Sequence, residues 1–81
     1  MPEIRREQVP ERLLLHLLTR VRERKISGEN LSLLGRWLDT EPEVPERRWF
    51  KRFPEFTVCG EGELVKTFLL PGQAPDGREI S

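Results

Sequence analysis

The residues best suited to binding chemistry are gathered in one short stretch, ERRWFKRF, at positions 46–53. Seven of its eight residues are cationic or aromatic, and the cations are Arg47, Arg48, Lys51 and Arg52. Arginine binds phosphate oxygens through paired hydrogen bonds, and several cations on one surface can neutralise a nucleic-acid backbone. The stretch therefore favours contact with DNA or RNA. The same residues also fit a solvated helix face, or contact with an acidic protein.

Charge is distributed unevenly along a chain that is neutral overall. Lys and Arg together number 14, as do Asp and Glu, so the whole molecule has no net attraction to nucleic acid or to an anionic membrane. Residues 1–25 carry seven cations and four anions, whereas residues 47–53 carry four cations and no anion. A second basic group, Arg22, Arg24 and Lys25, can therefore assist the first in contacting a phosphate backbone.

The other reactive side chains do not assemble into a catalytic or metal site. Glu61 and Glu63 are expected at an exposed hairpin turn, outside the kind of cleft that acid–base chemistry needs. Cys59 and His16 are far apart in the sequence, and one cysteine with one histidine cannot supply the four ligands of a structural zinc site. We therefore expect no catalytic residue, no metal and no cofactor, in a protein that is not an enzyme.

The elements that position these residues must fit into one small domain. The chain has 81 residues, of which 36% are hydrophobic and 35% charged, and a chain of this size forms one core of limited stability. Residues 1–9 are charged and aperiodic and predict a flexible N-terminal arm. Residues 10–70 predict a single domain of helices with a β-hairpin, and residues 71–81 a turn-rich C-terminal segment.

Two amphipathic helices are predicted in the first half of the chain. Pro10 suits the start of the first helix, which is expected to extend to about Lys25, and Ser27 suits the N-cap of the second, which extends to about Thr40. Apolar residues at helical spacing give each helix one apolar face. The first face comprises Leu13, Leu14, Leu17, Leu18 and Val21, and the second Leu31, Leu34, Trp37 and Leu38. Together these faces are expected to form the core.

A short third helix and a β-hairpin complete the predicted α+β fold. Pro45 and Pro54 bracket the basic stretch, and at helical spacing its four cations lie on one side and its aromatic residues on the other. From Phe56 onwards, FTVC and LVKTFLL alternate around GEGE, which predicts a hairpin. Three helices followed by a hairpin resemble a reduced winged-helix arrangement, in which the third helix would enter a major groove.

Two functional hypotheses follow for this small module. The first is a non-enzymatic regulator that binds DNA or RNA through the basic third helix. The second is a protein-interaction module, such as a small subunit, an inhibitor or an antitoxin-like partner, that uses the hairpin edge or exposed aromatic residues to bind another protein or a second copy. The single cysteine indicates a reducing compartment, and the run LLLHLL is too short to span a bilayer, so a cytoplasmic protein without membrane contact is expected.

Overall fold

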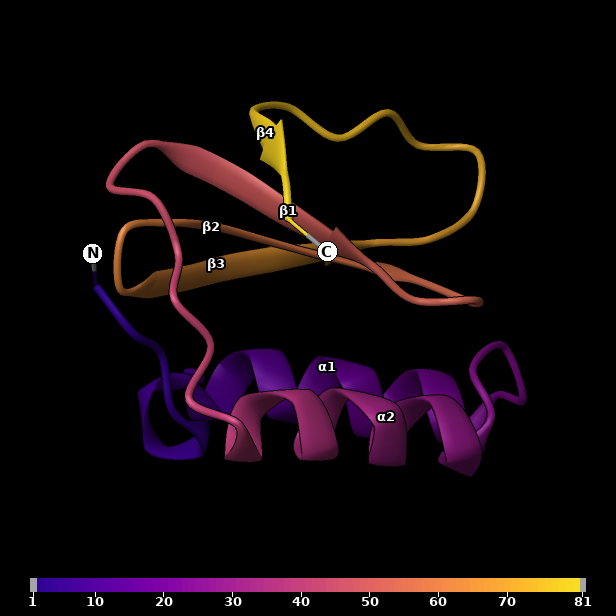
Figure 1. Cartoon of the computed structure of the whole chain (residues 1–81). Helices are drawn as coiled ribbons and strands as arrows, with labels where there is room; N and C mark the ends of the chain where they lie inside the picture. Colours follow the sequence, from indigo (N-terminus) through magenta and orange to yellow (C-terminus); the bar gives the residue numbers. More distant parts are fainter. Residues whose placement is uncertain (1, 81) are drawn as a thin grey trace.

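The structure is a computed structural model that describes residues 2–80. Two helices lie beneath one face of a four-stranded sheet, which confirms the predicted α+β class (Figure 1). The helices are α1 (Glu11–Arg22) and α2 (Gly28–Asp39), preceded by a short 3-10 turn, η1 (Arg6–Gln8). The strands are β1 (Arg48–Arg52), β2 (Thr57–Glu61), β3 (Leu64–Leu69) and β4 (Arg78–Glu79).

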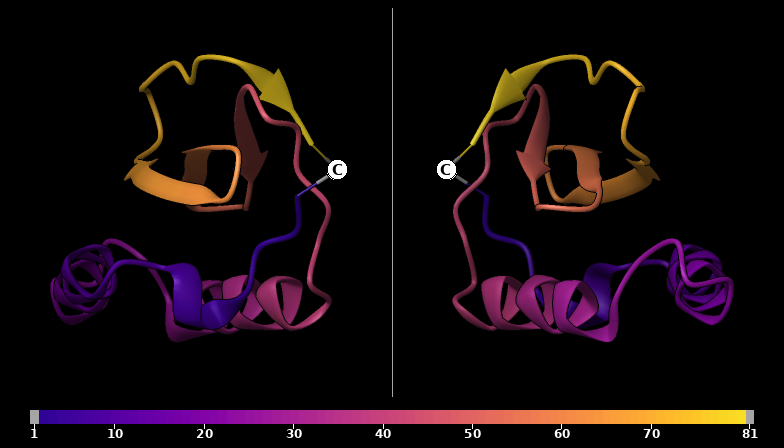
Figure 2. Two further views of the ribbon diagram at one scale, coloured as in Figure 1. Left: turned by 90° about the vertical axis from the view of Figure 1, so that its left-hand side faces the viewer. Right: turned by 90° about the vertical axis from the view of Figure 1, so that its right-hand side faces the viewer.

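The sheet is mixed, with the order β3-β2-β1-β4. Strands β1, β2 and β3 pair antiparallel in sequence order, whereas β4 returns to pair parallel with β1. Seen end-on, the segment between β3 and β4 arches over the face of the sheet opposite to the helices (Figure 2). The molecule therefore has a helix layer, a sheet, and a thin C-terminal cover over the outer face of the sheet.

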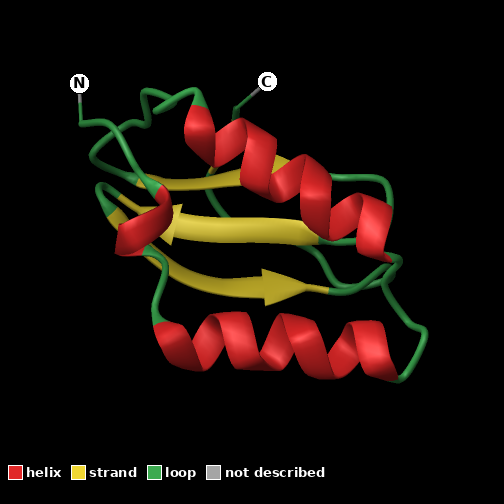
Figure 3. Cartoon of the chain, turned by 90° about the horizontal axis from the view of Figure 1, so that it is seen from below, coloured by secondary structure: helices red, strands yellow, loops and turns green. Residues whose placement is uncertain are grey.

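The two predicted helices are confirmed, together with the cap of the second. The Ser27 hydroxyl accepts a hydrogen bond from the Asn30 backbone amide at 3.2 Å, as an N-cap residue should. The first helix ends at Arg22, three residues earlier than expected, because Arg24 adopts a left-handed conformation with φ of 61°. Viewed from below, the helices run antiparallel, with α1 beneath the β3 side of the sheet and α2 beneath the other strands (Figure 3).

The core lies between the helices and the sheet and is centred on Trp49. Its side chain is completely buried, its indole Nε1 donates a hydrogen bond to the Gly62 carbonyl at 2.9 Å, and its ring contacts Trp37 at a centroid distance of 6.1 Å. Gly60 lies directly beneath the Trp49 ring, where a Cβ atom would overlap it. The other large side chains with less than 2% exposure are Ile4, Leu17, Ile26, Val44, Phe56 and Val58.

The predicted third helix is wrong, because residues 48–52 form strand β1. Successive side chains of a strand point to opposite faces, so the cations do not form one continuous side as they would on a helix. Aromatic residues favour a pleated surface that is buried, and pairing of Phe50 with Cys59 and of Trp49 with Gly60 places both aromatic residues in the sheet centre. Without this helix, the described residues contain no recognition helix of the winged-helix type.

The predicted hairpin is confirmed, but its register differs from simple alternation. Alternation along LVKTFLL predicts that Leu64, Phe68 and Leu70 face the helices, yet Leu64 is 65% exposed and Val65 is buried instead. The reason is a β-bulge: Gly60 pairs with Val65 and Cys59 with Thr67, so Lys66 is an extra residue on β3. This inserted residue shifts the alternation, so that Val65 points inward before the bulge while Phe68 and Leu70 still pack against the core after it.

The N-terminal segment packs against the domain, where the sequence predicts a flexible arm. Ile4 is completely buried, Val9 is 7% exposed, and the Ile4 amide donates a hydrogen bond to the Pro42 carbonyl at 3.1 Å. At the other end, Arg78 and Glu79 form an edge strand and Ile80 packs against the core. Neither α1 nor α2 is long and apolar enough to cross a membrane, and the same holds for every helix among residues 2–80.

Candidate interaction surfaces

Strand β1 divides the predicted basic group between the two faces of the sheet. Trp49 and Lys51 share the face that covers the helices, whereas Arg48, Phe50 and Arg52 share the outer face. The Lys51 ammonium lies 5.7 Å from the Phe53 ring centroid, and the Arg52 guanidinium lies 5.4 Å from that of Phe50. The four cations are therefore not brought together as one phosphate-binding surface.

The two arginines on the outer face are paired with acidic side chains. Arg48 donates a hydrogen bond to Asp76 at 2.6 Å and lies 3.9 Å from Glu61, and these two carboxylates raise the pKa of Arg48. Arg52 lies 3.6 Å from Glu79. Because three anions from β2 and the C-terminal segment surround two cations, this face offers little net attraction to phosphate.

The other predicted cations have no ion pair within 4.0 Å among the residues that the structure describes. Arg47 lines an open groove with Arg48 and Arg78, where β4 lies alongside β1. Sequence reasoning missed Arg78, because nothing local to residue 78 indicates that it pairs in parallel with Trp49. Arg22 ends α1, and Arg24 and Lys25 lie in the turn that follows it, at the opposite end of the molecule from the start of β1 (Figure 1).

The remaining reactive groups lie apart from one another. Cys59 is half-buried on the outer face opposite Phe50, and burial raises the pKa of its thiol. The His16 ring packs edge-on against Phe68 at 6.5 Å, and Glu61 forms an ion pair with Lys66 at 3.0 Å. Within residues 2–80, no three His, Cys, Asp or Glu side chains are grouped so that they could hold a metal ion.

A surface that the sequence did not indicate is the apolar groove between the two helices, which we call the interhelical groove. Its volume is about 250 Å³. Five of its seven lining residues are leucines, and the lining comprises Arg6, Leu14, Leu18, Leu31, Leu34, Gly35 and Leu38. Leu14 is 38% exposed and Leu18 is 46% exposed, although the sequence places both in the core.

The exposure of these leucines follows from the position of α1 in the fold. At 100° per residue, Leu13 and Leu17 point to the sheet, and Leu14 and Leu18 follow about 100° further round the helix. Because α1 lies beneath the edge strand β3, the sheet covers only the first of these directions. The second direction points toward α2, and no element of the described chain fills that space from below.

The N-terminal segment closes one end of the interhelical groove. Arg6 donates two hydrogen bonds to the Asp39 carboxylate, at 3.0 and 2.9 Å, and this pairing holds its guanidinium over Gly35. A Cβ atom at Gly35 would lie 2.8 Å from the Arg6 Nη2. The absence of a side chain at position 35 therefore leaves room both for Arg6 and for the groove.

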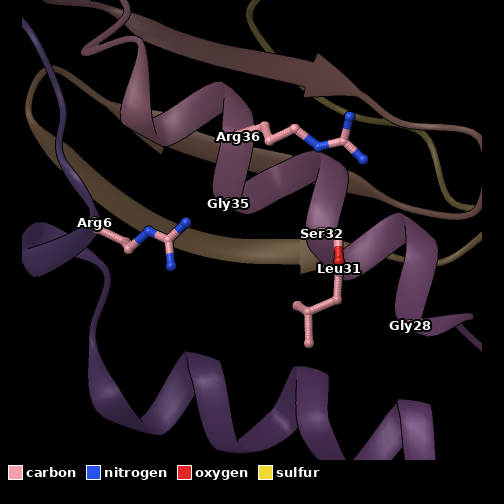
Figure 4. Close-up of a pocket in the computed structure, with 6 residues that line it drawn as sticks. All are labelled: Arg6, Gly28, Leu31, Ser32, Gly35 and Arg36. Atoms are coloured by element: carbon pink, nitrogen blue, oxygen red, sulfur yellow. The ribbon is translucent and has the colours of Figure 1, made fainter.

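A second depression continues the groove across the lower surface of α2. It shares Arg6, Leu31 and Gly35 with the interhelical groove and adds Gly28, Ser32 and Arg36. Figure 4 shows Leu31 pointing from α2 toward α1, and Arg6 reaching from the N-terminal segment toward Gly35. The small residues on this side of α2 would let another helix approach closely.

Comparison of the chain with protein-family models, with curated proteins and with solved structures finds no match.

Proposed function

We propose that this protein is a non-enzymatic protein-interaction module that binds a helix of a partner in the interhelical groove. The observation that carries the proposal is the exposure of Leu14 and Leu18 beside Leu31, Leu34 and Leu38, in a concave and almost wholly apolar surface. An amphipathic helix inserts apolar side chains at positions i, i+3, i+4 and i+7 into grooves of this kind. Covering apolar surface contributes about 25 cal/mol per Å² removed from water.

The interhelical groove fits this role better than the hairpin edge and aromatic surfaces expected from the sequence. Strand β3 is at the edge of the sheet, but its bulge and Lys66 are features that discourage pairing with another strand. Trp49, Phe50 and Phe56 are at most 7% exposed, so they offer little surface to a partner. Four of the five exposed large apolar side chains among residues 2–80, Leu14, Leu15, Leu18 and Leu33, belong to the helix layer, and the fifth, Leu64, begins β3.

A selection experiment with matched variants tests the proposal. A displayed library of 18-residue amphipathic helices is selected on the folded protein, and each binder is measured against the double variant Leu14→Ser, Leu18→Ser. The control variant is Leu15→Ser, Leu33→Ser, because these leucines are also exposed, at 55% and 36%, but lie outside the groove. We expect the first variant to lose at least tenfold in affinity and the second to bind normally.

Two outcomes would contradict the proposal. One is a selection that yields no helical binder. The other is a set of binders whose affinity is unchanged by Leu14→Ser, Leu18→Ser, since such helices would occupy a different surface.

Contact with a nucleic-acid backbone is the second candidate function, and one observation favours it. Arg47 and Arg78 have no ion pair within 4.0 Å in the described part of the chain, and both line the groove beside Arg48. Titration with duplex DNA, single strands and RNA at several salt concentrations tests this candidate. Engagement of roughly three phosphates would make log affinity fall with log salt at a slope of about −2 to −3. Absence of binding at low salt would exclude it.

A further inference from the structure

Resting on the proposed function, we infer that the partner of the interhelical groove is an acidic amphipathic helix. Two arginines that form no ion pair within 4.0 Å among residues 2–80 lie just outside the apolar lining. Arg22 lies one helical turn beyond Leu18 on α1, and Arg36 lines the depression that continues the groove on α2. A partner helix whose apolar face fills the groove would bring its polar flanks over these guanidinium groups.

The acidic side chains near these arginines are mostly engaged elsewhere. Asp39 accepts both of its ion-pair hydrogen bonds from Arg6, and Glu23 binds Arg20 at 2.8 Å. Over residues 11–39, seven charged side chains form no ion pair within 4.0 Å of another described residue. They are the cations Arg12, Arg22, Arg24, Lys25 and Arg36 and the anions Glu11 and Glu29.

Three of the cations without an ion pair in the described chain lie at one end of the groove, and Arg36 lies toward the other end, in the last turn of α2. Arg22, Arg24 and Lys25 occupy the end of α1 and the turn into α2, whereas Arg6 and Asp39 neutralise each other at the opposite end. Complementary charges around an apolar contact select the partner and speed its association. Glutamate or aspartate residues on the partner helix are therefore expected to lie over the turn between α1 and α2.

The same charge pattern disfavours a second copy of this chain as the occupant. In a twofold interface each copy presents the same patch to the other, so Arg22 and Arg36 of both copies would gather around one apolar contact. Like charges brought together across an interface oppose binding. An acidic helix meets no such repulsion.

Three synthetic peptides distinguish the inference from the proposed function. They share one 18-residue leucine-rich apolar face and carry Glu, Gln or Lys on the flanking positions. We expect the Glu peptide to bind roughly tenfold tighter than the Lys peptide, with the Gln peptide between them and the preference decreasing as salt is added. For the double variant Arg22→Glu, Arg36→Glu, the order of Glu and Lys peptides should reverse.

The control variant is Arg12→Glu, Arg47→Glu, which changes charge equally at exposed cations that do not line the groove. This variant should still bind the Glu peptide most tightly and the Lys peptide least tightly. Circular dichroism with urea unfolding checks that each variant is folded. Equal affinity for all three peptides, with loss of binding in Leu14→Ser, Leu18→Ser, would overturn the inference while the proposed function stands. Failure of all three peptides to bind would count against both.

The oligomeric state of the protein tests whether a second copy occupies the groove. Sedimentation equilibrium of the protein alone should show a monomer at micromolar concentration. A dimer that dissociates on Leu14→Ser, Leu18→Ser would place a second copy in the groove and overturn the inference of an acidic partner.

Discussion

The outer face of β1 and the interhelical groove differ in whether other parts of the fold pair with or cover their side chains. On β1, Arg48 and Arg52 are paired with Asp76 and Glu79, and the C-terminal segment covers the surface. In the groove, leucines remain exposed, and the nearby Arg22 has no ion pair within 4.0 Å among the described residues. In the cluster that looks functional in the sequence, two of the four cations are paired with carboxylates, whereas leucines that look like core residues are left exposed.

A local run of charged residues can be interpreted only when the residues next to it in space are known. The positive charge of residues 47–53 is offset by anions from positions 61, 76 and 79, which the sheet brings alongside. Apolar residues are informative when no other part of the fold covers them. A leucine that no other element covers contributes little to the core. A groove lined by such leucines therefore indicates a binding surface.

The two faces of β1 should differ strongly in how much their side chains contribute to stability. Trp49→Ala should lower the free energy of unfolding by about 3–5 kcal/mol, because it removes a completely buried ring from the centre of the core. Arg52→Ala, on the outer face of the same strand, should lower it by less than about 1 kcal/mol, since its ion pair is exposed. Urea unfolding of both variants checks this. Similar losses would mean that β1 is not oriented as described.

The next effect compares neighbouring leucines on α1. Leu17 is 1% exposed and Leu18 is 46% exposed, so Leu17→Ala should cost about 2–5 kcal/mol and Leu18→Ala less than about 1 kcal/mol. The same two variants should behave oppositely in binding a helical peptide, where only Leu18 contacts the partner. If Leu18→Ala destabilises the protein as much as Leu17→Ala does, the groove is closed in solution and the comparison between the two regions fails.

A smaller effect is expected at the glycines of α2. Gly35→Ala should change the free energy of unfolding by less than about 1 kcal/mol, because displacement of Arg6 offsets the gain in helix propensity. Gly28→Ala should have a smaller effect still, because Gly28 is the first residue of α2. A methyl group at position 35 meets Arg6 and narrows the groove, whereas at position 28 it meets nothing within 4 Å. Peptide affinity should therefore fall for Gly35→Ala and remain unchanged for Gly28→Ala. Equal affinities in isothermal titration calorimetry would show that the groove is not the peptide site.

The smallest effect concerns Cys59 on the outer face of the sheet. Burial raises the pKa of its thiol, so alkylation by iodoacetamide should reach half its maximal rate at a higher pH than for a free thiol, near 8.5. The unfolded chain then releases the thiol proton before the folded protein does, and stability should decline slightly as pH rises above about 8.5. Cys59→Ser should remove this decline. An alkylation profile matching a free thiol would show that the C-terminal segment does not cover this face.

Much of the fold was predictable from local patterns. Pro10, the Ser27 cap and the leucine spacing predicted both helices, and the two alternating segments around Gly62 predicted the hairpin. The prediction of a third helix was wrong because a stretch as short as ERRWFKRF fits both the helical period of about 3.6 residues and the strand period of two. Its conformation is decided by pairing with β2, which is a contact across the sheet and not a property of the stretch itself.

The candidate site was much less predictable than the fold. Helical periodicity showed which side of α1 is apolar, but not that this side is wider than the surface of the sheet above it. That outcome depends on the placement of α1 beneath the edge strand β3, and the exposure of Leu14 and Leu18 follows from it. Arg36 gave no signal either, because its position beside the groove appears only when α1 and α2 are placed together.

The most direct test of helix binding in the interhelical groove is an NMR titration of the ¹⁵N-labelled protein with the Glu-flanked peptide. The largest shifts in amide signals should fall on residues 14–18 and 31–36, with smaller shifts at Arg22 and little change in β1 and β4. Largest shifts at residues 46–52 and 76–79, or no shift at saturating peptide, would contradict binding in the groove between α1 and α2.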